Sequence, residues 1–177
     1  MDARHQAAFQ RRRKNLIRRA RKAAARANSW RGFRVGCAVL AWNGKKYQSF
    51  VGANVKPVDG GSKFCSEWQA IGTARAEGFH LIVAVVVSGK PQMDQRSGFE
   101  PPTLHPCEAC RFLMRNISEI LDDTIILTVC NSEGPEEEMS FLELWELHRY
   151  HEKQRSSQEE TDRAAREWAR QDREQSD

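Results

Sequence analysis

Three cysteines have the type and spacing of metal ligands. Cys107 and Cys110 form a Cys-x-x-Cys motif directly after Pro106, and Cys65 lies upstream. Each group stands at the start of a predicted helix, where free backbone N–H groups and the helix dipole stabilise thiolates. Two helix starts that face each other across the edge of a sheet would bring three thiolates to one Zn²⁺. Three protein ligands leave a fourth position for water, which is typical of a catalytic zinc site.

Glu67 stands two residues after Cys65 and is the only acidic residue within that motif. Zinc lowers the pKa of a bound water toward neutrality and so provides hydroxide at physiological pH. A carboxylate beside the open position need not bind the metal, since it can take a proton from the water and deliver it to a substrate nitrogen. Activated water and a proton shuttle together favour the hydrolytic loss of ammonia from an amino-substituted ring.

A purely structural zinc site is the alternative interpretation of the same cysteines. It requires a fourth ligand, for which Cys37, Cys130 and His105 are the candidates. Cys37 and Cys130 lie in apolar segments, where a cysteine is usually a small core residue. His105 fits a loop position or a hydrogen bond to a metal ligand. A closed site would leave Glu67 without a role, so we favour the catalytic interpretation.

Helices and buried strands alternate along the chain and must position these residues. Apolar spacing and turn residues predict the order helix, strand, strand, helix, strand, helix, strand, helix. Ser140 and Glu143 form a predicted capping box for the last helix. This order favours an α/β fold with a mixed sheet flanked by helices. The expected helices are residues 3–27, 65–77, 107–121 and 140–150, and the expected strands are residues 33–42, 45–55, 81–88 and 124–130.

The 177 residues carry a net charge of +4, but this charge is unevenly distributed. Residues 1–31 hold eleven Lys or Arg against one acid. Apolar residues at three- and four-residue steps predict that this segment is a basic helix that packs on the domain. Its basic face is either solvated, which is the commoner case and the one we favour, or a surface that contacts phosphates. It lacks aromatic residues between its charges, so base stacking is not expected.

Three regions are expected along the chain: the basic helix at 1–31, the domain that carries the chemistry at 32–151, and a charged tail at 152–177. The tail is almost wholly polar, and we expect it to be mobile or weakly helical and outside the core. The longest apolar run, residues 81–87, is too short to span a bilayer. No secretory signal pattern is visible, so we expect a cytoplasmic protein with no membrane-bound part.

The combined motifs resemble the signature of the zinc-dependent cytidine deaminase family. They are Cys65-Ser66-Glu67 and Pro106-Cys107-x-x-Cys110, and residues 33–38 and 52–55 are similar to further segments of that family. The resemblance spans roughly residues 16–145. It implies a three-layer cytidine deaminase-like fold, a zinc cofactor, and hydrolytic deamination of a cytosine nucleoside, such as cytidine or deoxycytidine, to the uracil form.

The resemblance also implies roles for individual residues. Cys65, Cys107 and Cys110 would bind zinc, Glu67 would be the general acid and base, Asn54 would hydrogen-bond the sugar, Phe33 would pack beside the base, and the backbone around Ser66 would recognise the pyrimidine edge. Neighbouring subunits of a homo-oligomer, a tetramer or a dimer, would complete the sites. Without the resemblance, Asn54 is typical of a strand end, and Phe33 is equally typical of a core.

Two positions depart from the family pattern and affect the expected substrate. Lys56 stands where nucleoside deaminases usually have a Glu that binds ribose hydroxyls. A cation there favours a phosphate or carboxylate on the substrate, although a lysine at such a position is more often solvated. Trp68 replaces the Arg that commonly follows the catalytic Glu and offsets the thiolate charge, a role that would pass to Arg111.

Other functions stay open at this point. Blasticidin S deaminase, from the same family, also lacks that Glu, and Gly60-Gly61 and residues 72–74 are similar to its pattern. Deamination of such a cytosine-nucleoside antibiotic is therefore an alternative. A nucleic-acid-binding or editing member of the fold is a second alternative, favoured by the basic helix and disfavoured by the net acidic charge of residues 32–151. A third is a family member without catalytic activity.

Overall fold

A five-stranded mixed sheet forms the centre of the protein. The computed structural model describes residues 2–58 and 63–176, so Gly60-Gly61 lies outside the described residues. The strand order is β3-β2-β5-β6-β7, in which β5 and β6 are parallel and the other neighbours are antiparallel. The strands are β2 (Gly36–Trp42), β3 (Tyr47–Ala53), β5 (Leu81–Ser88), β6 (Ile125–Val129) and β7 (Glu136–Ser140). A separate two-stranded sheet pairs β1 (Asn28–Ser29) with β4 (Val55–Lys56) in parallel.

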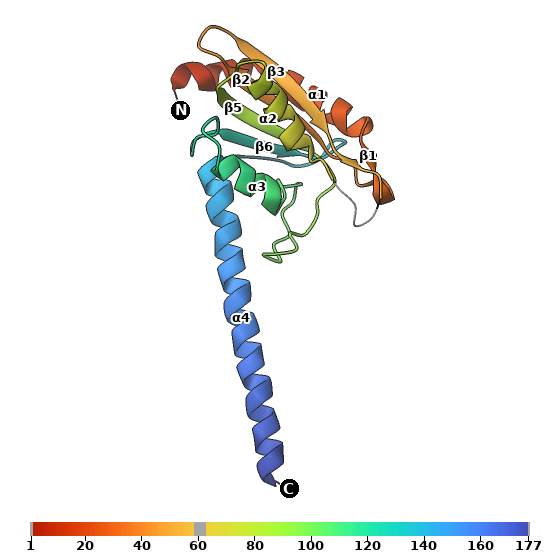
Figure 1. Cartoon of the computed structure of the whole chain (residues 1–177), viewed down its shortest axis with the longest axis vertical. Helices are drawn as coiled ribbons and strands as arrows, with labels where there is room; N and C mark the ends of the chain where they lie inside the picture. Colours follow the sequence, from red (N-terminus) through yellow and green to blue (C-terminus); the bar gives the residue numbers. More distant parts are fainter. Residues whose placement is uncertain (1, 59–62, 177) are drawn as a thin grey trace.

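Helices cover both faces of the central sheet, which gives three layers (Figure 1). On one face, α1 (Ala3–Ala25) packs against β2, β3 and β5. On the other lie α2 (Ser66–Ala76), α3 (Glu108–Arg115) and the first turns of α4 (Phe141–Ser176). Each face has its own apolar cluster. The expected three-layer α/β fold with an N-terminal basic helix is confirmed.

The basic helix α1 is held to the sheet by its apolar stripe. Asp2 caps it, because the carboxylate accepts a hydrogen bond from the Arg4 N–H at 2.8 Å. Phe9, Leu16 and Ile17 are buried against the sheet. Burial of a side chain of this size contributes about 1.5–3 kcal/mol. Packing of these apolar side chains therefore stabilises α1 more than the intrinsic helix propensity of its residues does.

Two glycines allow helices to approach the sheet closely from opposite sides. A Cβ atom at Gly36 in β2 would lie 2.1 Å from the Ala20 carbonyl oxygen of α1. A Cβ atom at Gly52 in β3 would lie 2.1 Å from the Ser66 carbonyl oxygen in the first turn of α2. Both contacts are with backbone, which cannot rotate out of the way. The position of α2 on the sheet therefore depends on Gly52.

Strand direction explains why two helix starts meet at one edge of the sheet. Both β3 and β5 are antiparallel to β2, so they run in the same direction. The chain reaches α2 after β3 and α3 after β5. Helices that follow strands of the same direction begin at the same edge, where α/β proteins commonly place their sites. The cysteines of both helix starts are thereby brought to one region.

Several predicted boundaries are wrong. The helix predicted over 107–121 ends at Arg115, where Asn116 is the C-cap. The apolar spacing that favoured a longer helix continues through the turns that follow it. Strand β7 was not predicted, since its three glutamates hide the strand pattern, and it lies at the sheet edge, where charged side chains are tolerated. The predicted strands 33–42 and 45–55 are shorter, at β2 and β3.

The last helix extends far beyond its predicted end at Tyr150. The capping box is confirmed, because the Ser140 N–H donates to Glu143 at 2.6 Å and the Glu143 N–H donates to the Ser140 hydroxyl at 3.1 Å. From there α4 continues unbroken to Ser176, so the expected tail is helical and belongs to the same helix. Its distal part projects away from the sheet (Figure 1). No helix in the described ranges is long and apolar enough to cross a membrane.

Candidate metal centre and active site

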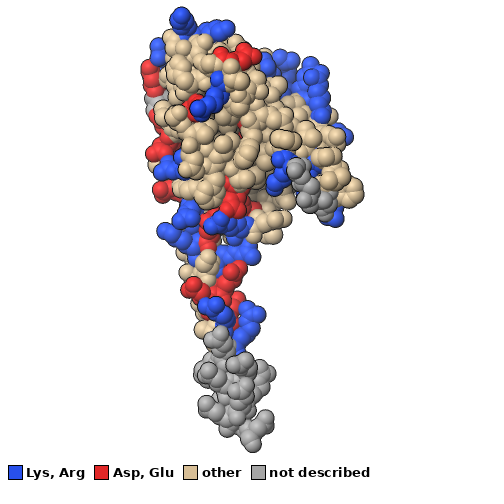
Figure 2. Space-filling view, in the orientation of Figure 1, with Lys and Arg blue, Asp and Glu red and all other residues tan. Residues whose placement is uncertain are grey.

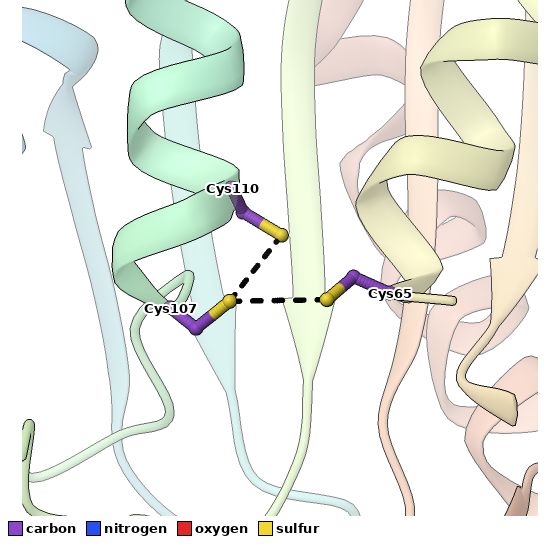
Figure 3. A group of neighbouring side chains, drawn as sticks. All are labelled: Cys65, Cys107 and Cys110. Atoms are coloured by element: carbon purple, nitrogen blue, oxygen red, sulfur yellow. Dashed lines mark hydrogen bonds between the residues drawn. The ribbon is translucent and has the colours of Figure 1, made fainter. Parts of the chain in front are cut away.

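The three predicted cysteine ligands lie together at the shared helix edge (Figure 3). Cys65 is the N-cap of α2, Cys107 is the N-cap of α3, and Cys110 lies in the first turn of α3. The Cys107 sulfur is 3.8 Å from the Cys65 sulfur and 3.6 Å from the Cys110 sulfur. All three sulfurs lie within 4.8 Å of one another.

The cluster fits a tetrahedral zinc ion. Two thiolates that bind Zn²⁺ at the usual 2.3 Å distance are about 3.8 Å apart in tetrahedral geometry. The measured separations of 3.6 and 3.8 Å agree with that value. The cluster found within the described ranges includes none of the candidate fourth ligands, Cys37, Cys130 and His105. Three sulfur ligands and an open position are therefore the arrangement that the described residues offer.

The environment of the three sulfurs favours ionisation of Cys107 before Cys65 and Cys110. Hydrogen bonds with Cys110 and then with Cys65 lower the pKa of Cys107 well below the ordinary value of a thiol. The same contact with Cys107 raises the pKa of Cys110. Both Cys65 and Cys107 also face the positive end of a helix dipole. Such sulfurs are suited to a dication that takes the place of their protons.

Glu67 lies in the first turn of α2, next to this cluster, and only 3% of it is exposed. Its Oε2 accepts a hydrogen bond from the Ser66 hydroxyl at 2.9 Å. Burial, and then the negative charge at Cys107, raise the pKa of Glu67 above that of an ordinary glutamate. A buried carboxyl group with a raised pKa can both accept and return a proton near neutral pH.

Arg111 is buried, but its charge is compensated by an acid that sequence reasoning missed. Its Nη1 donates to Asp94 at 2.9 Å and to the Pro106 carbonyl at 2.8 Å. Although burial raises the pKa of Asp94, hydrogen bonds from Ser97 and Arg111 lower it to about 2. Arg111 therefore fixes the loop before the metal motif and forms an ion pair with Asp94. Because Asp94 neutralises its charge, Arg111 has less positive charge available to offset the thiolates than the sequence led us to expect.

Two buried histidines also hold the loop that precedes the metal motif. The Nδ1 of His105 is 3.1 Å from the Nε2 of His148 on α4, and its Nε2 is 3.2 Å from Glu137 on β7. Burial lowers the pKa of both histidines, to about 3 for His148. Asp94, Glu137 and His148 gave no spacing signal in the sequence. Only the fold brings them to the metal motif.

The expected substrate residues lie on the adjoining segments. Asn54 and Phe33 are in contact, because the Asn54 amide donates to the Phe33 carbonyl at 2.9 Å and accepts from the Val35 N–H at 2.8 Å. Phe33 borders the same apolar cluster as Cys65 and Cys107. Ser66 is buried beside Glu67. The half-buried Lys56 is in β4, two residues after Asn54.

Trp68 lies in the first turn of α2, next to Glu67 in the sequence, and 45% of it is exposed. An indole carries no positive charge, so Trp68 cannot replace the arginine that commonly follows the catalytic glutamate in the family. This position of α2 therefore carries no cation, and Arg111 is the buried cation that the sequence analysis named.

Fold and site together define a zinc-dependent enzyme of the cytidine deaminase type. The chain belongs to the cytidine and deoxycytidylate deaminase family, because the sequence model of the family's zinc-binding region matches residues 10–129. Comparison with curated protein sequences gives no significant match.

Solved structures agree with this assignment. Cytidine deaminase from Burkholderia pseudomallei is similar, with 25% identity and a TM-score of 0.59 over 74% of this chain and 94% of that one. Cytidine deaminase from Mycobacterium tuberculosis has the same fold, with 22% identity and a TM-score of 0.54 over 74% of this chain and 91% of that one. The enzyme from Mycobacterium leprae gives 23% identity and a TM-score of 0.53, over 74% and 94% of the two chains.

Proposed function

We propose that the protein deaminates a cytosine nucleoside, with cytidine and deoxycytidine as the first candidates, to the uracil form with release of ammonia. The observation that carries this proposal is the buried Glu67 beside three sulfurs at zinc-ligand spacing. A structural zinc site does not need a buried carboxyl group with a raised pKa. A hydrolytic deaminase needs one to move protons.

Cys65, Cys107 and Cys110 hold the zinc in this proposal. When bound, zinc supplies a Lewis acid that lowers the pKa of water toward 7. Glu67 accepts a proton from the attacking water and passes it to N3 of the cytosine ring. Glu67 then takes the remaining proton from the new hydroxyl group at C4 and delivers it to the amino group, which departs as ammonia and leaves a carbonyl oxygen. The Ser66 hydroxyl keeps the Glu67 carboxylate in place through its 2.9 Å hydrogen bond.

Asn54, Phe33 and Ser66 position the nucleoside. The Asn54 side chain is fixed by backbone contacts on both of its polar atoms. Its oxygen and its nitrogen each keep further hydrogen-bonding capacity, which suits a sugar hydroxyl. Phe33 offers an apolar surface to the base, and the backbone at Ser66 offers the polar contacts to its edge.

Lys56 sets the expected choice between substrates. A lysine in place of the usual Glu favours an anionic group near the sugar position, or a modified cytosine nucleoside such as blasticidin S. A substrate panel of cytidine, deoxycytidine, their 5′-monophosphates and blasticidin S decides between these classes. If Lys56 selects the substrate, K56E should improve kcat/KM for the unmodified nucleosides relative to the other substrates.

The central test compares two glutamate variants on the same helix. Ammonia release and ultraviolet absorbance are measured for the zinc-loaded wild type, for Glu67→Gln, and for Glu77→Gln, which alters an exposed residue at the end of α2. We expect Glu67→Gln to reduce kcat at least 100-fold with zinc content unchanged, and Glu77→Gln to have little effect. A wild type with one zinc per chain that turns over no substrate of the panel would refute the proposal and favour a non-catalytic family member.

We also propose that the protein is a homo-oligomer, a tetramer or a dimer. Four exposed apolar side chains adjoin the site: Val55, Val58, Phe64 and Trp68. Val55 and Phe64 are backed by a pair of backbone hydrogen bonds at 3.0 and 2.9 Å, which holds both side chains in the exposed position. Apolar side chains gathered in this way are typical of an interface. Light scattering after gel filtration should give a multiple of 20.3 kDa, and a monomer would contradict this proposal.

A further inference from the structure

Two sets of basic residues on α1 and its C-cap, Arg26, have different surroundings. Those of the first set are half-buried and bonded to the rest of the chain. Arg13 pairs with Glu136 and Glu138 at 2.8 and 3.3 Å, and Arg19 donates to the Ser49 carbonyl at 3.2 Å. Arg21 donates to the Cys130 carbonyl at 3.0 Å. These residues hold α1 on the domain, and their role is structural.

The second set is an exposed row of cations that we call the basic stripe: Arg11, Lys14, Arg18, Lys22 and Arg26. Steps of three and four residues place them on one side of the helix. The row spans about 22 Å at 1.5 Å per residue. Within the described residues no acidic side chain forms an ion pair with any of them. Like charges at this spacing repel each other, so the stripe attracts an external polyanion.

The C-terminal half of the stripe lines a groove of about 440 Å³. One wall consists of Arg18, Arg19, Lys22 and Arg26, and the other of residues 51–53 and Gln69. None of the lining residues is acidic. In Figure 2, Lys and Arg side chains gather at the upper right of the domain, over the C-terminal half of α1 as placed in Figure 1. Stripe and groove therefore form one continuous positive surface.

We propose that this surface binds the sugar–phosphate backbone of a nucleic acid strand. Arginine matches phosphate oxygens with two parallel hydrogen bonds, and three of the five stripe residues are arginines. The groove walls contain no aromatic residue, so bases are not stacked and the binding is independent of base sequence. This activity is separate from deamination, since no stripe residue belongs to the metal centre or the substrate site.

An anionic membrane is the competing partner, and the structure disfavours it. Helices that lie on membranes insert large apolar side chains next to their basic face. The large apolar residues of α1, Phe9, Leu16 and Ile17, are instead buried against the sheet. The exposed side of the helix therefore offers charge without an apolar anchor.

Salt dependence gives a quantitative test with wild-type protein. The probe is a fluorescein-labelled 20-nucleotide oligo(dT), and fluorescence anisotropy is measured between 50 and 200 mM NaCl. Five phosphate contacts predict a slope of log K against log salt of about −3.5 for a single strand. Affinity should therefore fall about 100-fold over this range. A slope shallower than −1 would overturn the proposal without recourse to any variant.

A triple variant locates the contacts. Arg18→Gln, Lys22→Gln and Arg26→Gln together remove three stripe cations but keep good helix formers. Two remaining contacts predict a slope of about −1.4, or about a sevenfold loss over the same salt range. The matched control removes three exposed cations from α4: Lys153→Gln, Arg163→Gln and Arg166→Gln. It should keep the wild-type slope.

Two outcomes would contradict the assignment. Equal loss of oligo(dT) binding in both triple variants would show a general effect of net charge. Binding to vesicles of phosphatidylserine and phosphatidylcholine that the stripe variant loses, without oligo(dT) binding by the wild type, would assign the surface to membranes. The far-ultraviolet circular dichroism spectrum and the urea unfolding midpoint should be the same in all three proteins, which shows that the variants are folded and keeps this test independent of the proposed reaction.

Discussion

Gly52→Ala should lower both stability and catalysis, whereas Gly36→Ala should lower stability alone. The new Cβ atom would lie 2.1 Å from the Ser66 carbonyl oxygen, 2.9 Å from the Gln69 Cβ and 3.0 Å from the Ala70 nitrogen. All three are atoms of α2 that no side-chain rotation can move. The start of α2 must therefore retreat by about 1 Å to reach ordinary van der Waals contact. Glu67 lies in that turn and moves with it.

The magnitude follows from two known effects. Overpacking of this kind costs about 1–3 kcal/mol of stability. A displacement of about 1 Å in a catalytic group lowers turnover about 100-fold. Gly36→Ala is the matched control, because its Cβ atom would lie equally close to the Ala20 carbonyl oxygen but on the other face of the sheet. It should lose similar stability and keep its kcat.

The assay combines urea unfolding, zinc content and steady-state kinetics on the same preparations of wild type, Gly52→Ala and Gly36→Ala. The expected pattern is a comparable loss of unfolding free energy in both variants and a loss of kcat only in Gly52→Ala. Full kcat in Gly52→Ala would show that the contact between β3 and α2 does not position Glu67. Equal loss of kcat in both variants would show that the effect on activity is not local to α2.

Three further predictions concern the metal motif and the loop before it. Cys110→Ser should abolish stoichiometric zinc binding measured by plasma mass spectrometry, whereas Cys130→Ser should leave one zinc per chain. Asp94→Asn leaves the buried Arg111 without its anion and should cost about 3–5 kcal/mol in urea unfolding; a loss below 1 kcal/mol would show that the pair does not support the fold. Asp94 has a pKa lowered to about 2, so its stabilisation is present above the unfolded value of 3.8 and is lost as pH falls from about 4 toward 2. His148 has a pKa lowered to about 3 by burial, so its contribution is complete above 6.5 and declines as pH falls below that value. Unfolding measured from pH 7 to pH 4 should therefore show decreasing stability with a smaller slope in His148→Gln, and equal slopes would refute this assignment.

The sequence was sufficient to predict those parts of the fold that depend only on a few neighbouring residues. The apolar runs that became β5 and β6, the capping box at Ser140, and the spacing of Cys107 and Cys110 each depend on a few neighbouring residues. The helix-start position of Cys65 followed from the same kind of reasoning. These features place the metal motif correctly because helix starts and Cys-x-x-Cys spacing are properties of short segments.

Features that depend on distant partners were not predictable in this way. Strand β7 is a strand because it pairs with β6, despite three consecutive glutamates. The early end of α3 depends on the cap at Asn116, while the apolar spacing continues beyond it. The pair of Asp94 and Arg111 joins a loop to a helix 17 residues later. No periodic pattern in the sequence marks a contact of that kind.

The arrangement of the two helix starts has a consequence for folding as well as for chemistry. Cys65 and Cys107 are 42 positions apart in the chain and come from separate segments. When zinc is bound by both, it acts as a cross-link that closes a long loop, much as a disulfide would. Chain-entropy estimates for a disulfide loop of that length give about 4 kcal/mol. The ion would thus serve as a removable cross-link between the starts of two neighbouring helices in one layer, and depletion of zinc from its surroundings would reduce the lifetime of the folded protein as well as its activity.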